Sequence, residues 1–105
     1  MNNSRENRLL DLKNNLEDIN KEVGKLMERL EQVKNGIDII RDDEEKAYDN
    51  LSESLQDSDI GENMQTAMEF MESAMDDVDF IVDNLQGAVQ GFEGVYSALD
   101  DAINC

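Results

Sequence analysis

The sequence of 105 residues contains no histidine, no proline and no tryptophan, and its one cysteine is the final residue, Cys105. Without histidine the chain lacks the commonest acid–base and metal-binding side chain, and a single cysteine cannot form an internal disulfide. Metal binding would therefore depend on carboxylates alone. These absences predict a protein that is not an enzyme and holds no metal or cofactor. Together with the abundant Leu, Met and Glu, the lack of proline favours an all-α fold.

Basic residues are also absent from the second half of the chain, because none follows Lys46. The net charge is −17, and residues 47–105 contribute fourteen acidic side chains to it. Nucleic acids and anionic membranes both select proteins with basic patches. The charge pattern therefore disfavours direct binding to either of them, and it favours a protein partner with a basic surface.

Long apolar runs are missing as well. The amino-terminal residues are polar, with no apolar stretch typical of a signal peptide, and no segment is long and apolar enough to span a bilayer. The sequence therefore predicts a cytoplasmic protein.

The first half carries a heptad pattern, in which apolar residues recur at alternating steps of three and four. With Leu9 at position a of a heptad lettered a to g, the pattern continues to Leu51, and Glu44 is its only charged member. It predicts a helix over residues 5–49 whose a and d positions face one partner helix. The clearest members are Leu9, Leu12, Leu16, Ile19, Val23, Leu26, Leu30, Val33, Ile37 and Ile40.

The second half repeats the pattern over residues 59–103 with a wider apolar face. With Met64 at position a, the e positions are apolar as well as the a and d positions. Such a face suits a helix that has more than one neighbour. We therefore expect a single domain over residues 1–105, folded as a long antiparallel two-helix hairpin that dimerises into an elongated four-helix bundle or coiled coil. The residues predicted for self-association are Met68, Met75, Val82, Val89, Tyr96 and Ile103.

Basic residues flank the first apolar pattern at positions e and g, where they can attract the acidic second helix. This attraction favours folding of one chain back on itself. The flanking residues are Arg8, Lys13, Arg29, Lys34 and Arg41.

The polar stretch over residues 50–58 separates the two patterns and predicts the tip of the hairpin. Asn50 suits the end of a helix, and Ser52 or Ser54 suits the start of a short helical turn. The sequence over residues 41–58, followed by Gly61 and Glu62, resembles that of short acidic helical proteins of phages and mobile elements of Gram-positive bacteria. A proline often stands in that family where this chain has Ser52. The resemblance implies a hairpin in a phage context and supplies no catalytic residue.

A calcium loop is a further possibility at the tip. Asp57 and Asp59 stand at the first and third positions of such a loop. Gly61, however, comes one position early, and Met68 stands where a bidentate acid is needed. The sequence therefore predicts no metal site.

A row of acidic residues marks one outer face of the second helix and is the main candidate for partner binding. Its five charges extend over about 21 Å of helix. The row therefore has about one charge per 4–5 Å of helix. The axial distance between phosphates along one DNA strand is about 3.4 Å, which is close to this value. The row could imitate DNA, or it could serve only to keep the protein soluble. It consists of Glu69, Glu72, Asp76, Asp79 and Asp83.

Two aromatic residues, Phe70 and Phe80, lie at positions g and c, outside the a, d and e face. An aromatic side chain among acids can anchor a partner, and packing within a bundle could equally cover it.

The pattern as a whole predicts a non-enzymatic, self-associating acidic protein that binds another macromolecule, such as a host defence protein inhibited by a phage. One alternative is a DNA mimic that occupies a basic nucleic-acid-binding groove. Another is a structural or assembly spacer.

Overall fold

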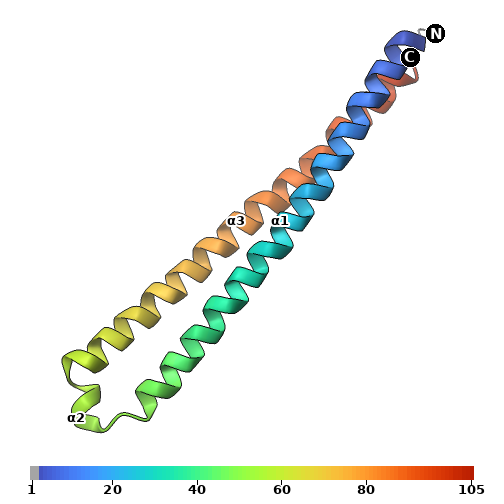
Figure 1. The fold of residues 1–105 in the computed structure, drawn as a ribbon. Helices are drawn as coiled ribbons and strands as arrows, with labels where there is room; N and C mark the ends of the chain where they lie inside the picture. Colours follow the sequence, from blue (N-terminus) through green and yellow to red (C-terminus); the bar gives the residue numbers. More distant parts are fainter. Residues whose placement is uncertain (1–2) are drawn as a thin grey trace. The chain divides into compact units, whose positions relative to one another are not determined.

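The computed structural model describes residues 3–105, which form three helices: α1 (Asn3–Asp49), α2 (Glu53–Gln56) and α3 (Asp59–Ile103) (Figure 1). The described residues contain no strand. The predicted all-α class is therefore confirmed. The two long helices lie close to the predicted ranges 5–49 and 59–103.

The chain divides into two compact units, and each pairs a segment of α1 with a segment of α3. We call Arg29–Ile81 the tip unit, and the described residues 3–28 with Val82–Cys105 the terminal unit. In the tip unit, Lys34 contacts Asp79 and Arg41 contacts Glu72. Residue numbers that rise along α1 thus meet falling numbers along α3, so the two segments are antiparallel and form a helical hairpin.

The terminal unit shows the same antiparallel pairing. Arg5 donates a hydrogen bond to the carbonyl of Cys105 (2.8 Å), and Lys13 pairs with Asp100 (2.6 Å). The hydrogen bond to Asp100 raises the pKa of Lys13, and the neighbouring charges of Asp100 and Glu17 raise it further.

The tip of the hairpin is closed by hydrogen bonds that involve short polar side chains. Ser52 caps α2, because its hydroxyl accepts from the backbone N–H of Leu55. The side-chain amide of Gln56 donates to the carbonyl of Tyr48 at 3.0 Å, which ties α2 back to the last turn of α1. Of the two serines that the sequence offered as the start of this turn, the structure uses Ser52.

Gly61 lies in the first turn of α3 and is buried against α2. A Cβ atom added at this position would lie 2.0 Å from the carbonyl oxygen of Gln56, and the other near atoms also belong to that backbone. A backbone neighbour cannot swing aside as a flexible side chain can. Only glycine therefore allows α2 and α3 to approach this closely.

On α1 the face turned toward α3 consists of the a and e positions. The a positions from Leu9 to Glu44 and the e positions from Glu6 to Tyr48 are half-buried, whereas the d positions are exposed. The heptad pattern predicted a contact through the a and d positions, and that prediction was wrong. The exposed d positions are Leu12, Ile19, Leu26, Val33, Ile40 and Ala47.

On α3 the inward face likewise consists of a and e positions. Met75, at an e position, is 7% exposed and is the only buried apolar side chain larger than glycine among residues 3–105. The six residues predicted for self-association are these e residues, and within the single chain they are half-buried or buried. They are Met68, Met75, Val82, Val89, Tyr96 and Ile103.

Two physical causes favour the a and e pairing. On α3 the e side chains are mostly larger than the d side chains, four of which are alanines, so burying the e row removes more apolar surface from water. On α1 the e positions include Lys13, Lys34 and Arg41, and this pairing brings them beside carboxylates at b positions of α3. If α1 and α3 met through their a and d positions instead, these bases would point away from the acids.

Tyr96 links the two helices of the terminal unit. Its hydroxyl donates to the carbonyl of Leu16 at 3.1 Å, and its ring stacks on Phe92 with a centroid separation of 6.2 Å. We expect Tyr96→Phe to lower the free energy of unfolding by about 1 kcal/mol, because one partly buried hydrogen bond is lost while the ring remains. Urea denaturation at a fixed protein concentration measures this loss. An unchanged midpoint would show that the bond contributes nothing.

Candidate functional site

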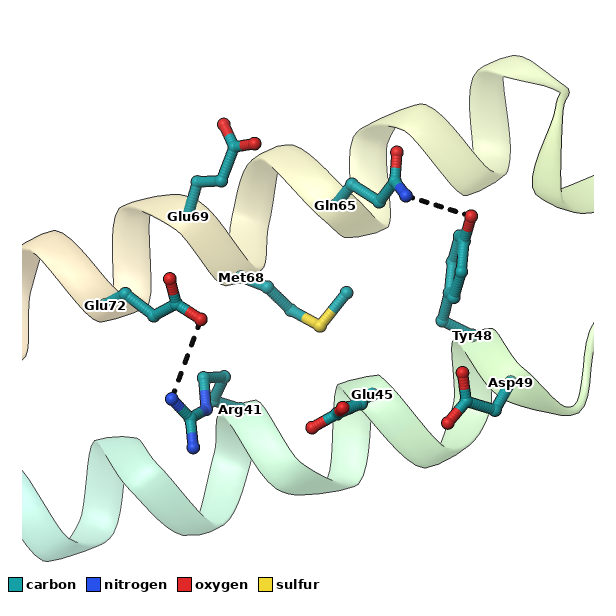
Figure 2. A pocket seen from close by; sticks show the side chains of 8 residues that line it. All are labelled: Arg41, Glu45, Tyr48, Asp49, Gln65, Met68, Glu69 and Glu72. Carbon is teal, nitrogen blue, oxygen red and sulfur yellow. Dashed lines mark hydrogen bonds and ion pairs between the residues drawn. The ribbon is translucent and has the colours of Figure 1, made fainter.

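The tip unit contains a polar groove that runs between α1 and α3 (Figure 2). It consists of two hollows, of about 560 and 540 Å³, which share Arg41 and Glu72. The lining residues from α1 are Lys34, Asn35, Asp38, Arg41, Glu45, Tyr48 and Asp49, and those from α3 are Gln65, Met68, Glu69, Glu72, Met75, Asp76 and Asp79.

Arg41 lies at the junction of the two hollows and connects the two helices. Its Nη1 atom lies 3.6 Å from Oε1 of Glu72 on α3. Its Nη2 atom lies 2.9 Å from Oδ1 of Asp38 and 3.2 Å from Oδ1 of Asp42, both on α1. The hydrogen bond to Asp42 is the main cause that raises the pKa of Arg41, and the charges of the acids around it add to the effect. Arg41 is thus held in place by acids on both helices.

The two ends of the groove are fixed by further contacts between α1 and α3. Nearer the tip, the side-chain amide of Gln65 donates to the hydroxyl of Tyr48 at 2.9 Å, as Figure 2 shows. At the other end, Nζ of Lys34 donates to both carboxylate oxygens of Asp79, at 2.7 and 2.9 Å. Contacts between α1 and α3 therefore hold the two helices together on each side of Arg41.

The pair between Lys34 and Asp79 sets a simple pH dependence. The hydrogen bond to Asp79 raises the pKa of Lys34 above its usual value of 10.5. Because the folded pKa exceeds the unfolded one, the pair stabilises the fold fully below the unfolded pKa, and this contribution is lost as pH rises through the folded pKa. At neutral pH, Lys34 is therefore protonated and donates to Asp79.

Carboxylates outnumber bases along the groove, which contains seven acidic and two basic side chains. Four acids of the predicted row, Glu69, Glu72, Asp76 and Asp79, lie here, whereas Asp83 belongs to the terminal unit. Glu72 and Asp79 are paired with bases of α1. Within residues 3–105, no ion pair involves Glu69 or Asp76. These two carboxylates are therefore the unpaired acids of the row in the tip unit.

Helix α1 also contributes acidic side chains to the groove, and these were not predicted from the sequence. Asp38, Glu45 and Asp49 line the groove opposite the acids of α3. Asp38 and Glu45 occupy b positions of the first heptad pattern. When two antiparallel helices pair through a and e, the b positions of both helices lie on the same side of the contact. A prediction of a and e pairing would therefore have placed Asp38 and Glu45 beside the acids of α3.

The two predicted aromatic anchors lie away from the groove. Phe70 is 71% exposed and Phe80 is 68% exposed, the two highest values among the large apolar side chains of the described residues. Neither lines either hollow. A partner seated in the groove would need to extend around α3 to reach them.

The side chains that line the groove are mostly charged. Among the described residues, no group of three or more cysteine, aspartate or glutamate side chains is arranged to hold a metal ion. None of the helices in that part of the chain is both long and apolar enough to cross a membrane.

Comparison with known proteins gives no match: no family model, no curated protein and no solved structure corresponds to the chain. The resemblance of the tip sequence to phage and mobile-element proteins therefore stays a prediction.

Proposed function

We propose that this chain is a non-enzymatic, self-associating protein that binds a basic surface of another protein through the groove of the tip unit. The observation that carries the proposal is the charge of the groove, where acids from two helices face outward and only Lys34 and Arg41 oppose them. In the phage context that the tip sequence suggests, the partner would be a host defence protein that the chain inhibits.

The charge distribution supports recognition and fast association more than tight packing. Complementary charges raise association rates and exclude wrong partners, while each exposed pair adds little affinity. The ion pairs of Arg41 and Lys34 hold Glu72 and Asp79 in place, so a partner would meet these two carboxylates already ordered. The proposed complex is therefore sensitive to salt.

A DNA mimic is the second candidate, and the ion pairs weaken it. Pairing of Glu72 with Arg41 and of Asp79 with Lys34 leaves Glu69 and Asp76 as the unpaired acids of the row within this unit. Seven residues of helix separate these two charges, which is about 10 Å and well beyond the phosphate spacing. Competition between duplex DNA and the chain for the same partner would favour mimicry over recognition of a protein surface. A structural spacer would bind no soluble partner at all.

The test uses a variant with two neutralised acids, Glu69→Gln with Asp76→Asn, in the full chain. A partner is first captured from the native host at low salt, and its dissociation constant is then measured by calorimetry at several salt concentrations. We expect the variant to bind about tenfold more weakly, because each lost charge contributes about 0.5–1 kcal/mol. The slope of log K against log salt should also become shallower.

The matched control neutralises two exposed acids outside the groove, Asp43→Asn with Asp77→Asn. It removes the same net charge and should leave the affinity within about twofold of the original chain. Equal weakening by both variants would mean that net charge, and no particular surface, governs binding. Unchanged binding by the groove variant would overturn the proposal.

A further inference from the structure

The terminal unit leaves a row of large apolar side chains uncovered on α1. Leu12, Ile19 and Leu26 occupy successive d positions and are 56%, 45% and 47% exposed. On α3 the d positions of the same unit include Ala88 and Val95, which are also exposed.

The two d rows lie on the same side of the terminal unit. The helices are antiparallel and pair through a and e, and the ion pair between Lys13 (e) and Asp100 (b) marks the side on which the e and b positions of both helices meet. In a right-handed helix, d lies on the opposite flank of a from e. Both d rows therefore face away from that ion pair and form one apolar face.

The charge pattern shows what kind of molecule can cover this face. Beyond the d row, the exposed c and g positions of α3 carry no charge from Asn84 to Ala98 and include Gly87, Gly91 and Gly94. In a chain of net charge −17, this uncharged surface is where a second strongly acidic molecule can approach without placing carboxylates against carboxylates. Along this stretch of α3 a basic partner would find no acid at the c and g positions to pair with.

The chain as a whole exposes 7540 Å², whereas a compact globular protein of 11.9 kDa exposes about 6000 Å². A stable interface in which each partner buries roughly 800 Å² is therefore within the area that the chain leaves exposed.

We infer that the apolar face of the terminal unit is covered by the same face of a second copy of this chain. The large d side chains of α1 in one copy lie over the alanines and glycines of α3 in the other. Two-fold symmetry repeats this contact with the roles of the copies exchanged, so large side chains pack against small ones at both places. This inference deepens the self-association in the proposed function and rests on it. It assigns the contact to the d rows, because the e rows are already occupied by the pairing of α1 with α3.

The test compares two exposed leucines on the same helix, in the full chain. Leu12 lies in the d row, and Leu10 is similarly exposed (46%) at a b position. Leu12→Glu and Leu10→Glu add the same charge. Sedimentation velocity over a concentration series gives the dimer dissociation constant, and circular dichroism follows helix content. We expect Leu12→Glu to raise the dissociation constant about a hundredfold or more, since it buries an unpaired carboxylate. Leu10→Glu should leave it within about threefold.

Each outcome decides a separate point. Loss of the dimer in Leu12→Glu but not in Leu10→Glu, with or without loss of helix, supports the d-row contact. A dimer that tolerates Leu12→Glu, or that both changes weaken equally, overturns the contact and leaves self-association standing. An original chain that sediments as a monomer throughout removes self-association itself. Partner binding by the groove is measured separately and is unaffected by any of these results.

Discussion

Gly61→Ala is expected to lower the free energy of unfolding by about 3 kcal/mol. The added methyl group would lie 2.0 Å from the carbonyl oxygen of Gln56, so the backbone of α2 or the start of α3 must move. Such a movement strains the cap at Ser52 and the hydrogen bond from Gln56 to the carbonyl of Tyr48. Chemical denaturation measures the loss, and hydrogen exchange should show it first at the amides of residues 50–61.

The control for this prediction is Gly24→Ala, within α1, where an added Cβ would meet nothing within 4 Å. Alanine there should stabilise the protein by about 0.8–1 kcal/mol, since it costs less backbone entropy in a helix than glycine does. The two substitutions are chemically identical and should have opposite signs. Stabilisation by both would show that the tip accommodates a side chain at Gly61 and that the close approach of α2 to α3 is not required.

The geometry of the groove depends on this tip. Arg41 and Tyr48 on α1 meet Glu72 and Gln65 on α3 only while the tip keeps the two helices in register. A slip of one turn would move each α3 acid by about 5.4 Å relative to α1. We therefore regard Gly61 as a residue that positions the groove without lining it.

The helices and their direction could be predicted from the sequence because they depend on local patterns. Apolar periodicity and the lack of proline identify two long helices, and the cap at Ser52 follows from the preference of serine for that position. The requirement for Gly61 could not be predicted in this way. It arises from the backbone of Gln56, and no side-chain pattern records that contact.

The face on which the helices meet was predicted incorrectly for a physical reason. Heptad lettering identifies an apolar stripe, but on α1 the d row is as apolar as the a row, so periodicity alone places the contact at their centre. The structure rotates the contact toward e, where Lys13, Lys34 and Arg41 reach Asp100, Asp79 and Glu72. The same rotation brings α1 acids into the groove and exposes the d row, so one error concealed both candidate surfaces.

Met75→Ala is expected to cost about 2–3 kcal/mol of unfolding free energy, because Met75 is the one well-buried large apolar side chain among residues 3–105. It lines the same hollow as Lys34, Asp38 and Arg41. Met71→Ala, at a half-buried a position one turn earlier, is the matched control and should cost about 1 kcal/mol. Thermal and urea denaturation at equal concentrations measure both values.

The order of these two effects tests the register of the hairpin. If α1 and α3 meet through a and e, truncation of Met75 costs more free energy than truncation of Met71. If they meet through a and d, Met71 lies in the centre of the helix contact and Met75 lies at its edge. A larger loss for Met71→Ala would therefore contradict the a and e pairing. It would also withdraw the structural basis for both the acidic groove and the exposed d rows, since their positions follow from that pairing.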